Sequence, residues 1–157
     1  MRLQTFFSVL IAIMALAFAG YFISVKLFFN NPLPDAPCSM EITNGEFIND
    51  QFKNYRFNGS ITLWLNSNMI TIFGIYDTSE GKKQLNRSLL LENVKRQSNV
   101  ITAYVKTTNI APGDELHGVG SFFAAKDQSL TFHFEKIKRG EYLVMINNNW
   151  VSLCKEH

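Results

Sequence analysis

Reactive side chains are few and scattered along this sequence. His117, His133 and His157 do not pair with one another at the spacing of metal ligands on a helix or a strand. The Asp114-Glu115 pair follows a Pro-Gly dipeptide, so turn formation accounts for it, and a calcium site needs more oxygen ligands. No nucleophile elbow, phosphate-binding glycine loop or His-Glu-x-x-His motif occurs. The sequence therefore predicts no enzymatic activity, no metal and no cofactor.

The two cysteines offer the clearest covalent chemistry. Cys38 precedes nearly all of the β-rich sequence, and Cys154 lies close to the C-terminus. Neither has a second Cys or a His at ligand spacing, which disfavours a metal site. In an oxidising compartment, pairing them would tie the last strand to the start of the domain. We expect a Cys38–Cys154 disulfide, and the alternative is two separate buried thiols.

An apolar N-terminal segment decides which compartment the cysteines occupy. Leu3 to Val25 contain no charged residue, and a helix of this length spans about 34 Å, enough to cross a hydrocarbon core of about 30 Å. We predict a transmembrane anchor over 1–29, a Pro-rich spacer over 30–37 and one domain over 38–157. The alternative is a cleavable signal peptide, because Ala17-Phe18-Ala19 is an acceptable cleavage site.

Charges near the apolar segment predict its orientation. Arg2 is the only charged residue before it, so the positive-inside rule places the N-terminus in the cytoplasm and the domain on the opposite side of the membrane, although Lys26 weakens the bias. Beyond the anchor, residues 30–157 carry 13 basic and 13 acidic side chains. A neutral domain of this kind argues against nucleic-acid binding.

The domain is predicted to be mainly β. Short stretches with a two-residue hydrophobic period or rich in β-branched residues alternate with polar turns, and every connection is short. The stretch 84–96 also fits a short helix, but we assign it to a strand because a clear strand follows. We expect an antiparallel up-and-down β meander that closes as a small barrel or a flattened sandwich. The expected strands are 56–66, 69–77, 84–96, 100–107, 118–123, 130–137, 142–146 and 150–154.

Several predicted strands are apolar on both faces. Phe73 and Ile75 lie opposite the apolar residues of their own strand, as do Trp64 and Leu90 in theirs. In a small barrel only the inner face of each strand is shielded from water, so apolar residues on the outer face need another explanation. We therefore interpret Trp64, Phe73, Ile75 and Leu90 as residues that contact a partner protein or a lipid-like ligand. The alternative is that loops and the membrane-proximal segment cover them.

The layout of the whole chain resembles one family. An N-terminal anchor, a Cys after a Pro-containing spacer, a glycine-bearing strand pair from Gly59 to Gly74, Asn86-Arg87-Ser88 before an apolar strand, and a closing Trp150-x-x-x-Cys154 are similar to the FidL-like family of small membrane proteins. This family is similar in layout to ToxS-type partners of ToxR-type regulators. The resemblance carries over two positions, Cys38 and Cys154, as a disulfide.

The resemblance implies a non-catalytic accessory function. A protein of this kind would lie in the inner membrane with its own domain in the periplasm. It would bind the periplasmic domain of a membrane-bound winged-helix transcription regulator and complete a shared barrel with it. It would also respond to a small amphipathic ligand. Two alternatives remain open from the residues themselves. The first is a stand-alone periplasmic carrier or sensor of a small apolar ligand. The second is a secreted hydrolase or inhibitor released by cleavage after Ala19.

Overall fold

The chain folds into an apolar helix and a β-barrel. The computed structural model describes residues 2–29, 32–48, 54–78, 81–115, 126–147 and 150–157. It divides into two compact units, Met1–Asn31 and Pro32–His157. The first unit consists of helix α1, Arg2–Phe29, and within it the segment Phe7–Ser24 is long and apolar enough to cross a membrane. An apolar segment without proline satisfies all of its backbone hydrogen bonds best as a helix.

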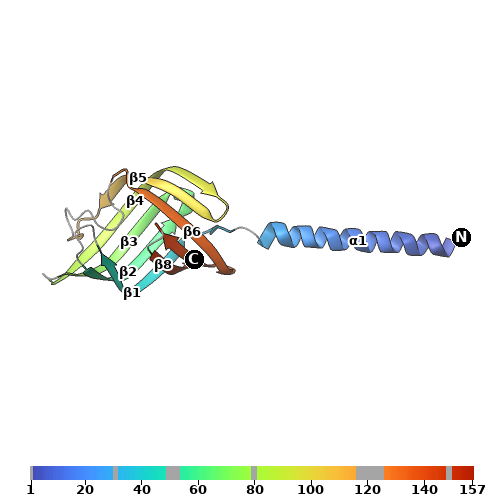
Figure 1. Ribbon diagram of the computed structural model, residues 1–157, viewed down its shortest axis with the longest axis horizontal. Helices are drawn as coiled ribbons and strands as arrows, with labels where there is room; N and C mark the ends of the chain where they lie inside the picture. The colour runs from blue at the N-terminus through green and yellow to red at the C-terminus, as the bar shows by residue number, and fades with distance from the viewer. Residues whose placement is uncertain (1, 30–31, 49–53, 79–80, 116–125, 148–149) are drawn as a thin grey trace. The chain divides into compact units, whose positions relative to one another are not determined.

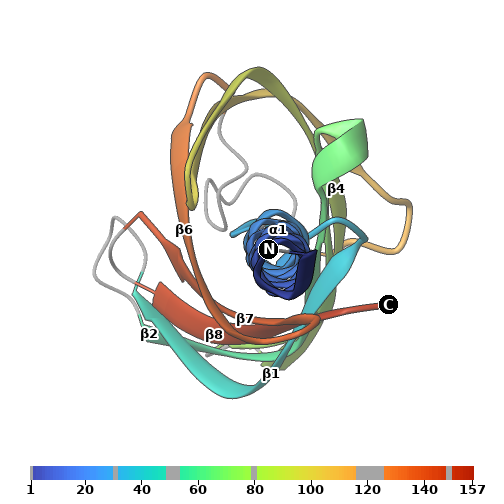
Figure 2. The same ribbon diagram turned by 90° about the vertical axis from the view of Figure 1, so that its right-hand side faces the viewer.

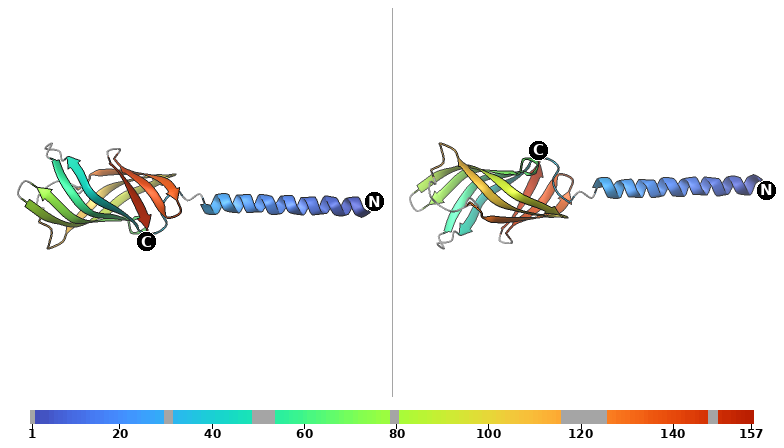
Figure 3. Two further views of the ribbon diagram at one scale, coloured as in Figure 1. Left: turned by 90° about the horizontal axis from the view of Figure 1, so that it is seen from below. Right: turned by 90° about the horizontal axis from the view of Figure 1, so that it is seen from above.

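The second unit is a closed barrel of eight antiparallel strands (Figure 1). Each strand pairs with the next along the chain, and β1 pairs with β8 to close the ring (Figure 2). Figure 3 shows the strands crossing the barrel obliquely. The strands are β1 (Cys38–Ile48), β2 (Asn54–Trp64), β3 (Met69–Thr78), β4 (Gly81–Gln97), β5 (Val100–Ile110), β6 (Ser129–Lys138), β7 (Glu141–Ile146) and β8 (Trp150–Glu156).

The predicted meander is confirmed as a closed barrel, with one strand added. We did not predict β1, because its two-residue period is interrupted. The register of β1 against β2 shifts between Ile42 and Gly45, and Asn44 adopts a positive φ of 53°. This is a β-bulge, which changes the face that each later residue occupies. The expected strand at 118–123 lies outside the described residues.

The barrel interior holds one continuous hydrophobic core. Inward side chains from all eight strands form it, and residues such as Ile61, Leu89 and Val144 are 0–1 % exposed. Cys38 and Cys154 belong to this core and form the expected disulfide, with their Cα atoms 5.5 Å apart. An eight-stranded barrel is just wide enough for its own side chains to fill it.

A pair of glycines lets β2 and β3 approach a buried aromatic ring. Gly59 and Gly74 are register partners, and the Phe57 side chain packs against both positions. A Cβ at Gly74 would lie 2.5 Å from the Phe57 ring and 2.5 Å from the Asn58 carbonyl oxygen. Covering of strand glycines by an aromatic side chain is a known device in curved sheets.

Gly74→Ala is expected to lower the free energy of unfolding by about 1 to 3 kcal/mol, because the added methyl group overpacks backbone and ring atoms. Urea titration of the purified chain measures this. Gly113→Ala is the matched control, since a Cβ there meets only the Gln84 side chain, at 3.5 Å. Equal stabilities of Gly74→Ala and wild type would contradict the overpacking.

Candidate functional site

The outer surface of β2, β3 and β4 carries a continuous uncharged face. Register pairs align their outward residues in four rows across the three strands. None of these twelve residues is acidic or basic, and we call them the uncharged face. Its rows are Trp64, Met69 and Leu90; Thr62, Thr71 and Ser88; Ser60, Phe73 and Asn86; and Asn58, Ile75 and Gln84.

The four residues predicted to contact a partner all lie on this face and are exposed. The exposed fractions are 37 % for Trp64, 55 % for Phe73, 48 % for Ile75 and 39 % for Leu90. They alternate with inward core residues, so the two-sided apolar pattern has a simple cause: one side packs in the barrel and the other meets solvent. The structure thus brings together residues that the sequence places on three separate strands.

Two members of the hydroxyl row, Thr71 and Thr62, are hydrogen-bonded to side chains next to the row. The Trp64 indole Nε1 donates to Thr71 Oγ1 at 3.1 Å, which holds the indole against the sheet. Thr62 Oγ1 lies 2.8 Å from Ser39 Oγ on β1. A side chain that is already held in place loses less entropy when another surface covers it.

A second group of apolar side chains lies on β6, β7 and β8. Leu143 and Leu153 are register partners, and Ile137, at 57 % exposed, belongs to the adjoining strand β6. Charged residues surround this group: Glu135 pairs with Leu143 in the register, and Lys138 forms an ion pair with Glu141 at 3.1 Å. We call Ile137, Leu143 and Leu153 the rimmed patch, because apolar residues inside a charged rim are typical of protein interfaces.

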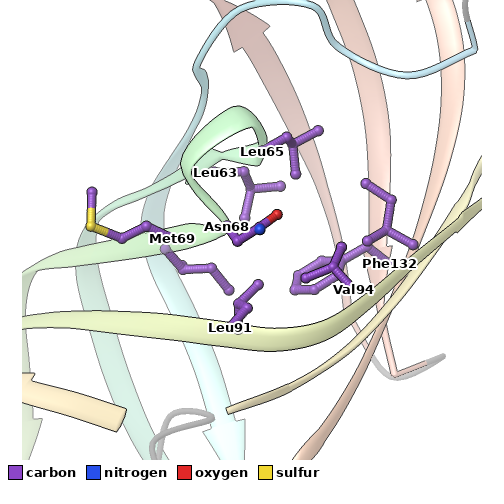
Figure 4. Close-up of a pocket in the computed structure, with 9 residues that line it drawn as sticks. Leu63, Leu65, Asn68, Met69, Leu91, Val94 and Phe132 are labelled. Carbon is purple, nitrogen blue, oxygen red and sulfur yellow. The ribbon is translucent and has the colours of Figure 1, made fainter. Parts of the chain in front are cut away.

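The described pocket in the barrel is too small for a drug-sized ligand. It has a volume of about 10 Å³, room for one water molecule. Figure 4 shows the side chains of Leu63, Leu91, Val94 and Phe132 gathered around it, while the Met69 side chain extends away. Ligand pockets usually occupy about 300 to 1,000 Å³.

A buried ion pair fastens the chain segment that follows β5. Arg87 points inward from β4, and its Nε and NH2 atoms donate to Asp114 at 2.8 Å and 3.2 Å. The side chains of Arg87 and Asp114 are 3 % and 0 % exposed. Asp114 Oδ2 also accepts a hydrogen bond from the Asn86 backbone N–H at 3.1 Å. The pair is therefore both desolvated and tied to the sheet.

The segment 111–115 forms a turn that is hydrogen-bonded to β4. Ala111 donates its backbone N–H to the Asn86 carbonyl oxygen, and the Glu115 backbone N–H donates to that of Gln84. The Gln84 backbone N–H donates in turn to the Glu115 carboxylate at 2.8 Å. The expected turn is present, since the Asp114 backbone N–H donates to the Ala111 carbonyl oxygen, but the ion pair with Arg87 is not predicted. Arg87 itself was the available signal, because it lies two residues from Leu85 and from Leu89 and so shares their inward face of β4.

Residues 32–37, predicted to be part of a spacer, contact the barrel. Tyr142 donates its hydroxyl to the Leu33 carbonyl oxygen at 3.4 Å, and the Asp35 backbone N–H donates to Glu156 at 2.7 Å. Burial raises the pKa of the Tyr142 phenol, and the carboxylates of Glu156 and Asp35 raise it further. Tyr142 therefore stays protonated and acts as a hydrogen-bond donor at neutral pH.

Known proteins give no direct guide to the function. Comparison finds no matching family, no matching curated protein and no matching solved structure. Within the described ranges, no group of three or more His, Cys, Asp or Glu residues is placed to hold a metal ion. His133 faces outward between the inward Phe132 and Phe134, as predicted. The resemblance to the FidL-like family stays a prediction, and the function has to be inferred from the surface.

Proposed function

We propose that this chain is a non-catalytic accessory protein of the inner membrane, which binds and modulates a membrane-bound winged-helix transcription regulator through its periplasmic barrel. One observation carries the proposal: the described barrel interior is filled by its own side chains, while large apolar side chains lie on the outside. Exposed apolar groups of this kind mark protein interaction sites. The disulfide fits an oxidising compartment, and α1 fits a membrane anchor.

The rimmed patch is the contact we assign to the regulator. Its apolar centre supplies buried area, and the charges of Glu135, Lys138 and Glu141 around it supply the means to select one partner. Charged rims contribute mainly to specificity and to the association rate. The regulator would present an apolar centre with charges that complement this rim.

A small amphipathic signal would then bind between the two proteins and not within this barrel alone. The pocket of about 10 Å³ holds no bile-acid-sized molecule. The alternative, a stand-alone carrier of a small apolar ligand, needs a larger cavity than this pocket.

Leu143→Glu is expected to lower recovery of the regulator at least about tenfold, because a second carboxylate at the patch centre would be buried beside Glu135, with which position 143 pairs in the register. The measurement is affinity purification of the full chain from detergent-solubilised membranes, with mass spectrometry of the recovered proteins. Lys106→Leu serves as a control, since it changes an exposed residue of β5. Failure of the wild-type chain to recover any regulator would contradict the proposed function.

A further inference from the structure

The uncharged face sets strict conditions on any surface that covers it. Its twelve residues span three strands, and charges border it at Arg56, Asp77 and Lys82 in the next row, at Glu92 beyond Leu90, and at Glu41 of β1, the register partner of Ser60. A partner surface with an acidic or basic group opposite this face would bury that group without a counter-charge, at a cost of several kcal/mol. The covering surface must therefore be uncharged over the same area.

The same face on a second copy of the chain meets this condition by identity. Two-fold dimers bury the same patch on both subunits, so an uncharged patch always meets an uncharged patch. The regular outward side chains of a sheet also favour face-to-face packing of two sheets. The rimmed patch lacks this property, because Glu135, Lys138 and Glu141 place charges around it that a covering surface has to match.

The order of the rows is also self-complementary. We place the two-fold axis in the interface, parallel to the central strand β3. The axis brings each row of one copy over the same row of the other and exchanges β2 with β4, so that Trp64 lies over Leu90. Phe73 then lies over Phe73, Ile75 over Ile75, and the hydroxyl row over the hydroxyl row. Apolar side chains therefore meet apolar side chains across the interface.

The area of the face predicts a weak dimer that the membrane reinforces. With strands about 4.8 Å apart and outward residues about 6.8 Å apart along each strand, twelve positions cover about 400 Å² per copy. Two copies thus bury about 800 Å², less than the 1,200 Å² or so of a stable complex in solution. Confinement of two anchored copies to one membrane raises their effective concentration and offsets this deficit.

We propose that two copies of this chain form a two-fold dimer through the uncharged face of β2, β3 and β4. The inference is independent of the regulator, since it assigns a different surface of the barrel and a different partner. The dimer leaves both rimmed patches free, so that the two sites can be tested separately.

A single cysteine near the axis tests the dimer in the full-length protein in native membranes. In Thr71→Cys, the two new thiols face each other across the axis, between sheets about 10 Å apart, and a short bismaleimide is expected to join them into a covalent dimer on a denaturing gel. Thr102→Cys on β5 is the matched control, because Thr102 is an outward and half-buried threonine outside the face. We expect at least about tenfold more crosslinked dimer from Thr71→Cys than from Thr102→Cys.

Phe73→Lys in the Thr71→Cys background is expected to abolish the crosslink, because two ammonium groups would then face the interface. Phe73 is 55 % exposed, so the barrel tolerates this change, and an unchanged melting temperature together with an intact Cys38–Cys154 disulfide verifies the fold. Ile75→Lys provides a second test with the same expectation. Equal crosslinking at positions 71 and 102, no crosslink at position 71, or a crosslink that survives both substitutions would overturn the proposal.

Discussion

Reduction of the Cys38–Cys154 disulfide is expected to lower the free energy of unfolding by about 4 to 5 kcal/mol, and the melting temperature by roughly 15 to 20 °C. The two cysteines are 116 positions apart in sequence, so the bond closes a loop that contains nearly the whole barrel. Breaking it returns that conformational freedom to the unfolded chain, which makes unfolding more favourable.

The position of the disulfide in the barrel strengthens this expectation. In the described ranges, β1 and β8 close the ring through three register pairs, Cys38–Glu156, Ser39–Lys155 and Met40–Cys154. By comparison, β3 and β4 share ten register pairs. Both cysteines are 0 % exposed, so the disulfide joins β1 to β8 from within the core. Reduction therefore weakens the part of the barrel with the fewest strand contacts.

The measurement is a urea titration of the full chain in detergent, with and without dithiothreitol, followed by near-ultraviolet circular dichroism. The double variant Cys38→Ala/Cys154→Ala is the control: reductant should shift the wild-type midpoint toward that of the variant and leave the variant unchanged. A wild-type midpoint that does not respond to complete reduction would show that the strand pairs alone close the barrel.

The sequence predicts most of the strands because their hydrophobic period is intact. Ile61 and Leu63 alternate with Thr62 and Trp64, and this pattern alone places each residue on the correct face of β2. β1 escapes the same reasoning because of its bulge at Asn44, where the Asn44-Gly45 dipeptide interrupts the period and is typical of a turn between strands as much as of a bulge within one. Sequence periodicity thus predicts regular strands and fails where the backbone leaves the regular pleat.

The candidate sites show a second limit, which concerns register. Trp64, Phe73, Ile75 and Leu90 are each recognisable as outward apolar residues in the sequence. The uncharged face is not recognisable, because the absence of charge becomes meaningful only when the strands are aligned row by row. The Arg87–Asp114 pair requires even more information, since Asp114 lies in a loop whose path no periodic pattern predicts.

Asp114→Asn is expected to lower the free energy of unfolding by about 3 to 5 kcal/mol. The substitution keeps the shape of the side chain and an oxygen that can accept from the Asn86 backbone N–H. It removes the negative charge, however, that lies 2.8 Å from the Arg87 guanidinium, which is buried at 3 % side-chain exposure. The expected loss of stability therefore measures the contribution of the charge pair and not that of side-chain packing.

Two further variants distinguish the effect of the Arg87–Asp114 pair from that of its surroundings. Their stabilities are compared with that of Asp114→Asn by urea titration. Glu115→Gln changes the neighbouring carboxylate, which is exposed, and should alter the stability by no more than about 0.5 kcal/mol. The double variant Arg87→Met/Asp114→Leu removes both charges and should recover most of the loss, because a hydrophobic replacement of a buried pair is often neutral or stabilising. If the double variant is as unstable as Asp114→Asn, the segment 111–115 depends on the hydrogen bonds of the Asp114 carboxylate. Recovery of stability in the double variant would show that the loss in Asp114→Asn comes from the buried Arg87 charge. It would also show that the backbone hydrogen bonds to Gln84 and Asn86 are enough to hold the segment 111–115 beside β4.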